Sequence, residues 1–98
     1  MKPAIFTELA ETDLIEIYTY SYQQWGTSQA DKYINILREG VNRLVSNPRL
    51  GKQRADIPAE CFVYHVQRHL IIYRLHQDNI EILRVLYDGM DMKKQFYQ

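Results

Sequence analysis

Two apolar runs in the last third of the chain decide the fold, and a short polar stretch separates them. The runs are His69-Leu-Ile-Ile-Tyr-Arg74 and Ile80-Glu-Ile-Leu-Arg-Val-Leu-Tyr87, and Gln77-Asp78-Asn79 lies between them. Their β-branched and aromatic residues favour strands, and so short a connection makes the two strands antiparallel neighbours. Another strand should precede them, with Gln67-Arg68 as its turn. The sequence therefore predicts an antiparallel meander of strands at roughly 61–67, 69–76 and 80–88.

The last of these strands is apolar on both faces. Regular alternation places Ile80, Ile82 and Leu86 on one face and Leu83, Val85 and Tyr87 on the other. A strand of this kind is usually covered on both sides. A helix hairpin can cover one face of the sheet, and the other face requires either the C-terminal tail or a partner.

The first half of the chain predicts that helix hairpin. Residues 3–6 form a short strand, Thr7 is a suitable N-cap, and Gly26 ends the first helix. Thr27 is expected to cap a second helix, which Pro48 ends because the residue before a proline avoids the helical conformation. The two apolar stripes are Ala10, Leu14, Ile17, Ser21 and Trp25, followed by Ala30, Tyr33, Ile34, Leu37, Val41, Leu44 and Val45. The predicted fold class is α+β, in the order β-α-α-β-β-β, with the hairpin packed on a small, mainly antiparallel sheet.

Composition limits the functions that the chain can have. With 98 residues, 46% of them hydrophobic, the chain is long enough for one domain over residues 1–98. The net charge is zero and the pI is about 6.8, so the basic footprint of a nucleic-acid-binding protein is missing. A single cysteine, Cys61, excludes an internal disulfide. No apolar run approaches the ~20 residues of a membrane span or forms a signal peptide, and the expected location is the cytoplasm.

The polar residues form no catalytic or metal-binding pattern. Cys61, His65 and His69 recur every four residues, but in a strand four residues span about 13 Å, too far to share one metal ion. The first helix carries Glu11, Asp13 and Glu16, and carboxylates on a helix surface mostly keep that surface solvated. We therefore predict no catalytic residue, no metal ligand and no cofactor.

The C-terminal tail, residues 88–98, and several arginines are the candidates for partner binding. Flexible methionines and amphipathic aromatic residues suit a contact surface, and the same tail could instead fold back over the open sheet face. The basic residues could line a groove for a phosphate backbone, but overall neutrality favours scattered, solvated charges. The candidate partner-binding residues are Tyr87, Met90, Met92, Lys93, Lys94, Phe96, Tyr97, Arg54, Arg74 and Arg84.

The order of these parts resembles the ParE branch of the ParE/RelE superfamily of bacterial toxins. The likeness covers nearly the whole chain, and its strength lies in the order and spacing of its pieces. The matching pieces are Asp13-Leu14, Ile17-Tyr18, Trp25-Gly26, Gln29-Ala30, Tyr33, Asn47-Pro48, Leu50-Gly51, His69, Ile71, Tyr73-Arg74, Arg84-Val85-Leu86 and Met90-Asp91. The chain departs from the usual pattern at Glu60-Cys61-Phe62, where many members carry a glycine, a bulky residue and an arginine. It departs again at Tyr87, where many have a histidine.

The resemblance implies a toxin of a type II toxin–antitoxin system that maintains a plasmid or chromosome. Such a toxin inhibits DNA gyrase by binding, and a ParD-like antitoxin neutralises it in a hetero-oligomer. The alternatives are a RelE-type ribosome-dependent messenger RNA endonuclease and an inactive relative that only binds an antitoxin. The RelE-type enzymes use strand arginines, and the positions aligned with them hold Phe62 and Leu70. Neither side chain can stabilise developing charge. The resemblance thus favours a binding inhibitor.

Overall fold

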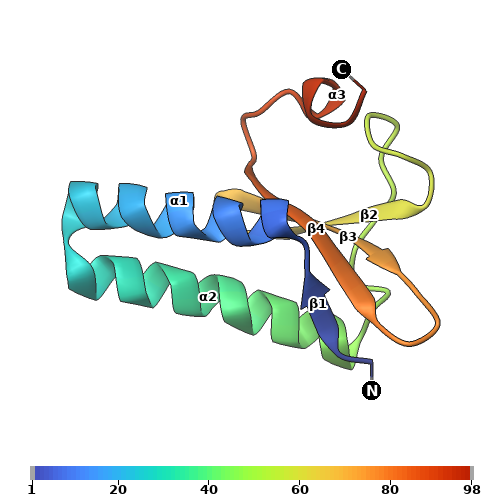
Figure 1. The fold of residues 1–98 in the computed structure, drawn as a ribbon, viewed down its shortest axis with the longest axis horizontal. Coiled ribbons are helices and arrows are strands. Elements are labelled where there is room, and N and C mark those ends of the chain that lie inside the picture. The colour runs from blue at the N-terminus through green and yellow to red at the C-terminus, as the bar shows by residue number, and fades with distance from the viewer. Residues whose placement is uncertain (1, 98) are drawn as a thin grey trace.

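The computed structural model describes residues 2–97 and confirms the predicted α+β fold (Figure 1). In chain order, the elements are β1 (Ala4–Phe6), α1 (Glu8–Trp25), α2 (Thr27–Ser46), β2 (Cys61–Val66), β3 (His69–Leu75), β4 (Ile80–Tyr87) and the short helix α3 (Met92–Phe96). The described residues form no helix that is both long and apolar enough to cross a membrane.

The four strands form one sheet in the order β1-β4-β3-β2. The antiparallel meander β2-β3-β4 is confirmed, with Gln67 at φ 55° in the first turn. The first strand pairs in parallel with the last, in the register Ala4 opposite Ile80. The sheet is therefore mixed, and its N-terminal edge strand depends on the most distant strand in the sequence.

A bulge in β4 changes which side chains face the helices. Ile82 pairs with Tyr73 and Arg84 pairs with Ile72, so Leu83 is an extra residue in β4. An extra residue reverses the alternation of side chains beyond it. Our expectation of regular alternation along this strand was therefore wrong. Val85 joins Ile80 and Ile82 in the helix-side core, and Leu86 joins Leu83 on the other face.

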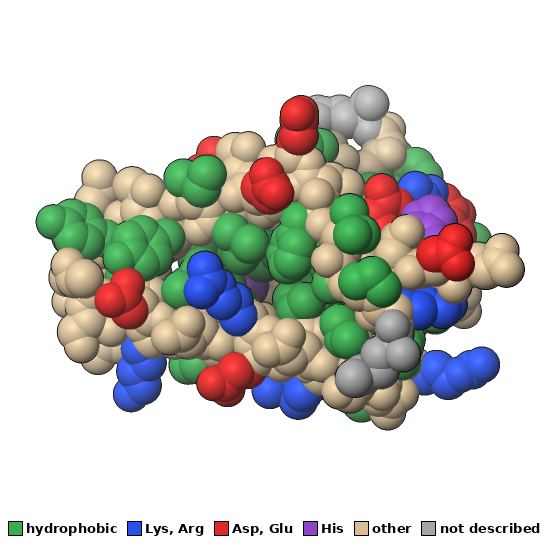
Figure 2. Space-filling model, turned by 60° about the horizontal axis from the view of Figure 1, so that its bottom comes forward, with side chains coloured by type: hydrophobic (Ala, Val, Ile, Leu, Met, Phe, Trp, Pro, Cys, Tyr) green, Lys and Arg blue, Asp and Glu red, His purple; other side chains and the backbone are tan. Residues whose placement is uncertain are grey.

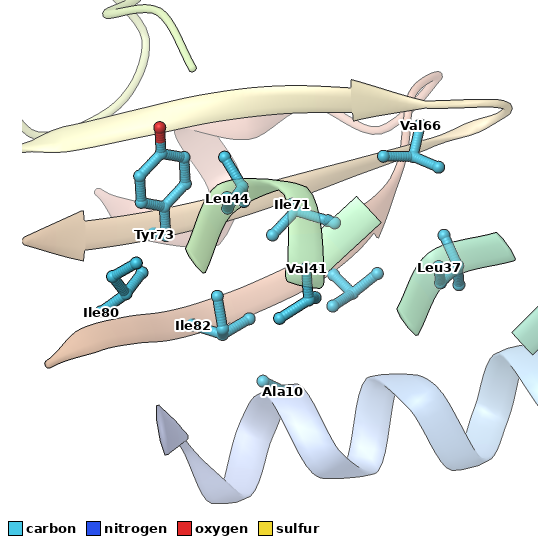
Figure 3. Packing of buried hydrophobic residues seen from close by; sticks show 10 residues of the cluster. Ala10, Leu37, Val41, Leu44, Val66, Ile71, Tyr73, Ile80 and Ile82 are labelled. Atoms are coloured by element: carbon cyan, nitrogen blue, oxygen red, sulfur yellow. The ribbon is translucent and has the colours of Figure 1, made fainter. Parts of the chain in front are cut away.

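The helix hairpin packs on one face of the sheet and forms the larger core (Figure 3). Thr7 caps α1 as predicted, because its side-chain oxygen accepts the backbone N–H of Ala10. The predicted Thr27 cap was wrong, since Thr27 is already helical and Gly26 occupies the cap position at φ 86°. The buried residues of the second stripe, confirmed in α2, are Ala30, Leu37, Val41 and Leu44.

The last residue of the first predicted stripe is exposed. Trp25, at the end of α1, is 64% exposed. The hairpin extends beyond the sheet, as Figure 1 shows, so its far end has no strand beneath it. Helical periodicity places Trp25 one turn after the buried Ser21 on the same face of α1, but it could not show that the sheet ends before this residue.

The opposite face of the sheet has its own core, which the tail and the 47–60 loop close. Met92 is 2% exposed and Ile57 3% exposed, and Phe96 packs beside them. The strand residues of this core are Cys61, Leu70, Ile72 and Leu86. Of the two predicted ways to cover this face, the structure adopts the tail.

Candidate partner-binding groove

A groove of about 840 Å³ lies between the helix hairpin and the adjacent ends of β3 and β4. Its walls are mostly aromatic and aliphatic side chains, which is typical of sites that bind another molecule. The lining residues are Asp13, Glu16, Ile17, Tyr20, Ser21, Trp25, Gln29, Tyr33, Arg68, His69, Arg84, Val85, Leu86, Tyr87 and Met90.

Three aromatic rings, one each from α2, β3 and β4, form one end of the groove. The Tyr33 hydroxyl lies 2.6 Å from Nδ1 of His69 and accepts the backbone N–H of Arg68 at 3.3 Å. Burial lowers the pKa of His69 and raises the pKa of Tyr33. Both rings are therefore neutral near pH 7. The Tyr87 ring meets His69 edge-on, with the ring centroids 6.0 Å apart.

A buried ion pair crosses the groove wall from α1 to β4. Arg84 donates from Nε and Nη2 to the two carboxylate oxygens of Asp13, at 2.8 and 2.9 Å. The same carboxylate accepts the backbone N–H of Val85 at 2.9 Å, beyond the point where β1 stops pairing. The hydrogen bonds that Arg84 donates to Asp13 raise the pKa of Arg84 further. Arg84 also donates to Gln95 of α3 at 3.2 Å, and so connects the hairpin to the tail.

The expectation that the Asp13 carboxylate is solvated was wrong, because Asp13 is only 7% exposed. The helical period carried a signal for this position. Asp13 follows the buried Ala10 by three residues and precedes Ile17 by four, so it lies on the inward side of α1. A carboxylate at such a position needs a cationic partner, and Arg84 is that partner.

The rim of the groove carries exposed aromatic and apolar groups. Tyr20 and Trp25 meet edge-to-face with centroids 6.0 Å apart, and they are 58% and 64% exposed. Met90 is 40% exposed. On the face drawn in Figure 2, hydrophobic side chains also form a band across the middle, with charged side chains around it. A surface of this kind is suited to a protein partner.

The structure separates the predicted partner-binding residues into three groups. Tyr87, Met90 and Arg84 line the groove. In α3, Met92 and Phe96 are turned into the second core, while Lys93, Lys94 and the following Tyr97 are exposed. Arg54 and Arg74 belong to neither region and bind acidic neighbours, Asp56 at 2.6 Å and Glu81 at 2.7 Å. The basic residues therefore do not converge on one phosphate-binding surface.

Sequence reasoning missed the other wall of the groove. Tyr20, Tyr33 and His69 were not among the partner-binding candidates, although Tyr33 and His69 belong to pieces that carried the family resemblance. Arg68 was considered only as one of the scattered basic residues. No group of three His, Cys, Asp or Glu side chains suited to a metal occurs within residues 2–97.

Comparisons with known proteins agree on one family. A model of the ParE toxin of the type II toxin–antitoxin system parDE matches residues 4–92. The chain is similar to Toxin ParE1 of Caulobacter vibrioides, with 31% identity over 95% of this chain and 96% of that protein. It is also similar to Toxin ParE1 of Mycobacterium tuberculosis, with 29% identity over 92% and 93% of the two chains.

Two solved structures show the same fold. One comes from the chromosomal ParDE system of P. aeruginosa, with a TM-score of 0.78 and 23% identity over 89% of this chain and 96% of that chain. The other is the YoeB dimer of Staphylococcus aureus, with a TM-score of 0.59 and 18% identity over 88% and 95%.

Proposed function

Since the chain belongs to the family of ParE toxins of type II toxin–antitoxin systems, we propose that it inhibits DNA gyrase by binding, and that a ParD-like antitoxin neutralises it by occupying the groove. The observation that carries this proposal is the groove itself. It combines about 840 Å³ of volume with aromatic walls, while both faces of the sheet are already covered.

The groove is a better place for an antitoxin than the sheet face that the sequence suggested. Met92 and Phe96 already cover the second face, so a partner there would have to displace them. The outer edge of β2 is also partly closed, because Val63 exchanges two backbone hydrogen bonds with Lys52, at 2.8 and 2.9 Å. An amphipathic segment laid into an apolar groove requires no such displacement.

The exposed side of α3 is the proposed gyrase contact. Met92 and Phe96 anchor the helix to the second core, so Lys93, Lys94 and Tyr97 are held on a fixed support. Asp91 caps α3 through the backbone N–H of Lys93 at 3.0 Å, which fixes the start of the helix. One exposed aromatic ring beside two cations is a small anchor of the kind that dominates binding energy at interfaces.

Messenger RNA cleavage is the second candidate, and one observation favours it. Tyr33, Arg68 and His69 lie together at the groove, and these residue types can exchange protons and stabilise a phosphate. Binding remains the preferred function because burial keeps His69 neutral and Tyr33 occupies its Nδ1. Arg84, the other arginine of the lining, is bound to Asp13.

Phe62 and Leu70, which align with the arginines of the RelE-type enzymes, are weaker evidence against a nuclease than the sequence suggested. Phe62 stacks on Tyr73 in the helix-side core, at a centroid distance of 5.6 Å. Leu70 is 4% exposed in the opposite core. The two positions lie on opposite faces of the sheet, so a single active site could not include both. Each apolar residue is accounted for by packing.

A supercoiling assay with purified gyrase tests the proposed target. The full chain should block supercoiling, and Lys93→Glu with Lys94→Glu should weaken the block at least tenfold without altering the circular dichroism spectrum. Lys32→Glu with Arg38→Glu, a matched charge reversal on exposed positions of α2, should leave potency unchanged. Equal potency of all three proteins would remove α3 as the contact, and full supercoiling with the unaltered chain would refute gyrase as the target.

Translating ribosomes provide the complementary test. Messenger RNA incubated with the purified chain should remain intact. Codon-dependent cuts that disappear with the His69→Gln variant would instead establish messenger RNA cleavage as the function.

The tail should be tested by substitution and not by deletion. A chain that ends at Gly89 lacks the buried Met92 as well as the exposed lysines. Its loss of activity would therefore report an opened core and a lost contact together.

A further inference from the structure

Two charged side chains of the groove have no partner within the part of the chain that the structure describes. The lining contains four carboxylate or guanidinium groups, and Asp13 and Arg84 neutralise each other. Glu16 and Arg68 form no ion pair there. Both residues are exposed, yet both border an apolar groove.

The backbones that carry these two charges are fixed. Glu16 lies in the middle of α1, one turn after the buried Asp13. Arg68 lies in the turn between β2 and β3, where its N–H is bound by the Tyr33 hydroxyl at 3.3 Å and its carbonyl accepts the N–H of Asp88 at 2.9 Å. The two charges therefore come from different walls of the groove and from elements that are held in place by long-range hydrogen bonds.

Charges in these positions are suited to selecting a partner. Ion pairs at an exposed rim contribute little to affinity, but they fix register and reject segments with the wrong charge order. The apolar lining between them is tolerant, since methionine and aromatic surfaces accept many hydrophobic side chains. The Asp13 and Arg84 pair carries no net charge, and Arg84 is already hydrogen-bonded to Asp13 and Gln95.

We propose that Glu16 and Arg68 set the direction and register of the segment that fills the groove. This inference rests on the proposed binding of an antitoxin there. The fitting segment is an amphipathic helix with apolar residues against the aromatic lining, a carboxylate against Arg68 and a cation against Glu16. In that direction, a segment with the reverse order of charges is disfavoured, because it brings like charges together at both positions.

A phage-displayed library of helical peptides tests the proposal without a known antitoxin. The library keeps an apolar stripe constant and offers Lys, Glu or Gln at each flanking position. It is selected on the full-length chain and on Arg68→Glu and Glu16→Lys. Peptides selected on the unaltered chain should carry Glu at one end and Lys at the other. Each variant should invert the preference at one end only, by roughly three- to fivefold for an exposed ion pair.

Matched controls separate this inference from the proposed function. Arg38→Glu and Glu39→Lys reverse exposed charges on α2 outside the groove lining, and should leave the selected charges unchanged. Trp25→Ala should weaken every selected peptide, which verifies that the groove is occupied. Peptides that bind Trp25→Ala as tightly as the unaltered chain would refute groove binding itself. Peptides that need Trp25 but show no charge preference, or that respond equally to Arg38→Glu, would overturn the roles of Glu16 and Arg68 alone.

Discussion

Replacing Asp13 by alanine should be among the most destabilising single changes in the protein. Asp13 accepts three hydrogen bonds, two from Arg84 and one from the backbone of Val85. Removing one member of a buried pair typically costs about 3–5 kcal/mol, because the other charge is left without compensation. The Arg84 side chain retains 18% exposure and can turn partly toward water, so we expect the lower end of that range, about 3 kcal/mol.

Such a loss is a large part of the stability of a domain this size, which is about 5–15 kcal/mol in total. Urea denaturation followed by circular dichroism measures it directly. The melting temperature should fall by about 12–24 °C, at about 4–8 °C for each kcal/mol. Glu81→Ala is the matched control, because Glu81 binds Arg74 at 2.7 Å in a more exposed ion pair. This variant should lower the free energy of unfolding far less than Asp13→Ala.

A double variant isolates the contribution of the pair. Adding Arg84→Met to Asp13→Ala should recover part of the lost stability, since the uncompensated charge is then removed. If Asp13→Ala and Glu81→Ala destabilise the protein equally and only slightly, the pair does not hold α1 to β4.

Three further changes test other parts of the structure by the same measurement. Leu37→Ala should lower the free energy of unfolding by about 2–5 kcal/mol because Leu37 is 1% exposed, while Arg38→Ala, at the exposed neighbouring position, should lower it little. Similar losses from both variants would show that the buried face of α2 has been assigned wrongly. Gly51→Ala should lower the free energy of unfolding by about 1–3 kcal/mol, since a Cβ there would lie 2.6 Å from Cε1 of Tyr73. An unchanged urea midpoint would show that the 47–60 loop can shift to accommodate the methyl group. His69 has its pKa lowered by burial, so the unfolded chain takes up this proton first as pH falls. The free energy of unfolding should thus decrease below about pH 6.5, and more steeply than in His69→Gln; parallel pH profiles would contradict a buried neutral imidazole.

The sequence predicted the elements well because their local signals are strong. The regular apolar stripe around Leu37 and Val41 and the polar turns between β-branched runs depend only on near neighbours. The bulge at Leu83 could not be predicted in this way, because it depends on how β4 pairs with β3. The exposure of Trp25 was missed for a similar reason, since it depends on where the sheet ends.

The candidate site was only partly predictable. The methionines of the tail pointed to Met90, and Tyr87 at the end of the last strand was also a candidate; both line the groove. Met92, also a methionine of the tail, is buried in the second core. Residue type alone could not show whether a methionine packs inside the protein or faces a partner. The far wall of the groove, with Tyr33 and His69, combines residues 36 positions apart in the chain. No local pattern reports a convergence of that kind.

The pairing of β1 with β4 has a consequence for how the chain is made. The first strand to leave the ribosome must wait for the last, since Ala4 pairs with Ile80. Until then the helices can form, but one end of their core lacks Ile80 and Ile82. Contacts between residues so distant in sequence slow folding, because the entropy of closing a long loop is lost before those contacts can contribute stability. The nascent chain therefore has no finished groove until β4 has been synthesised. A protein with this topology completes the groove in a late step of folding.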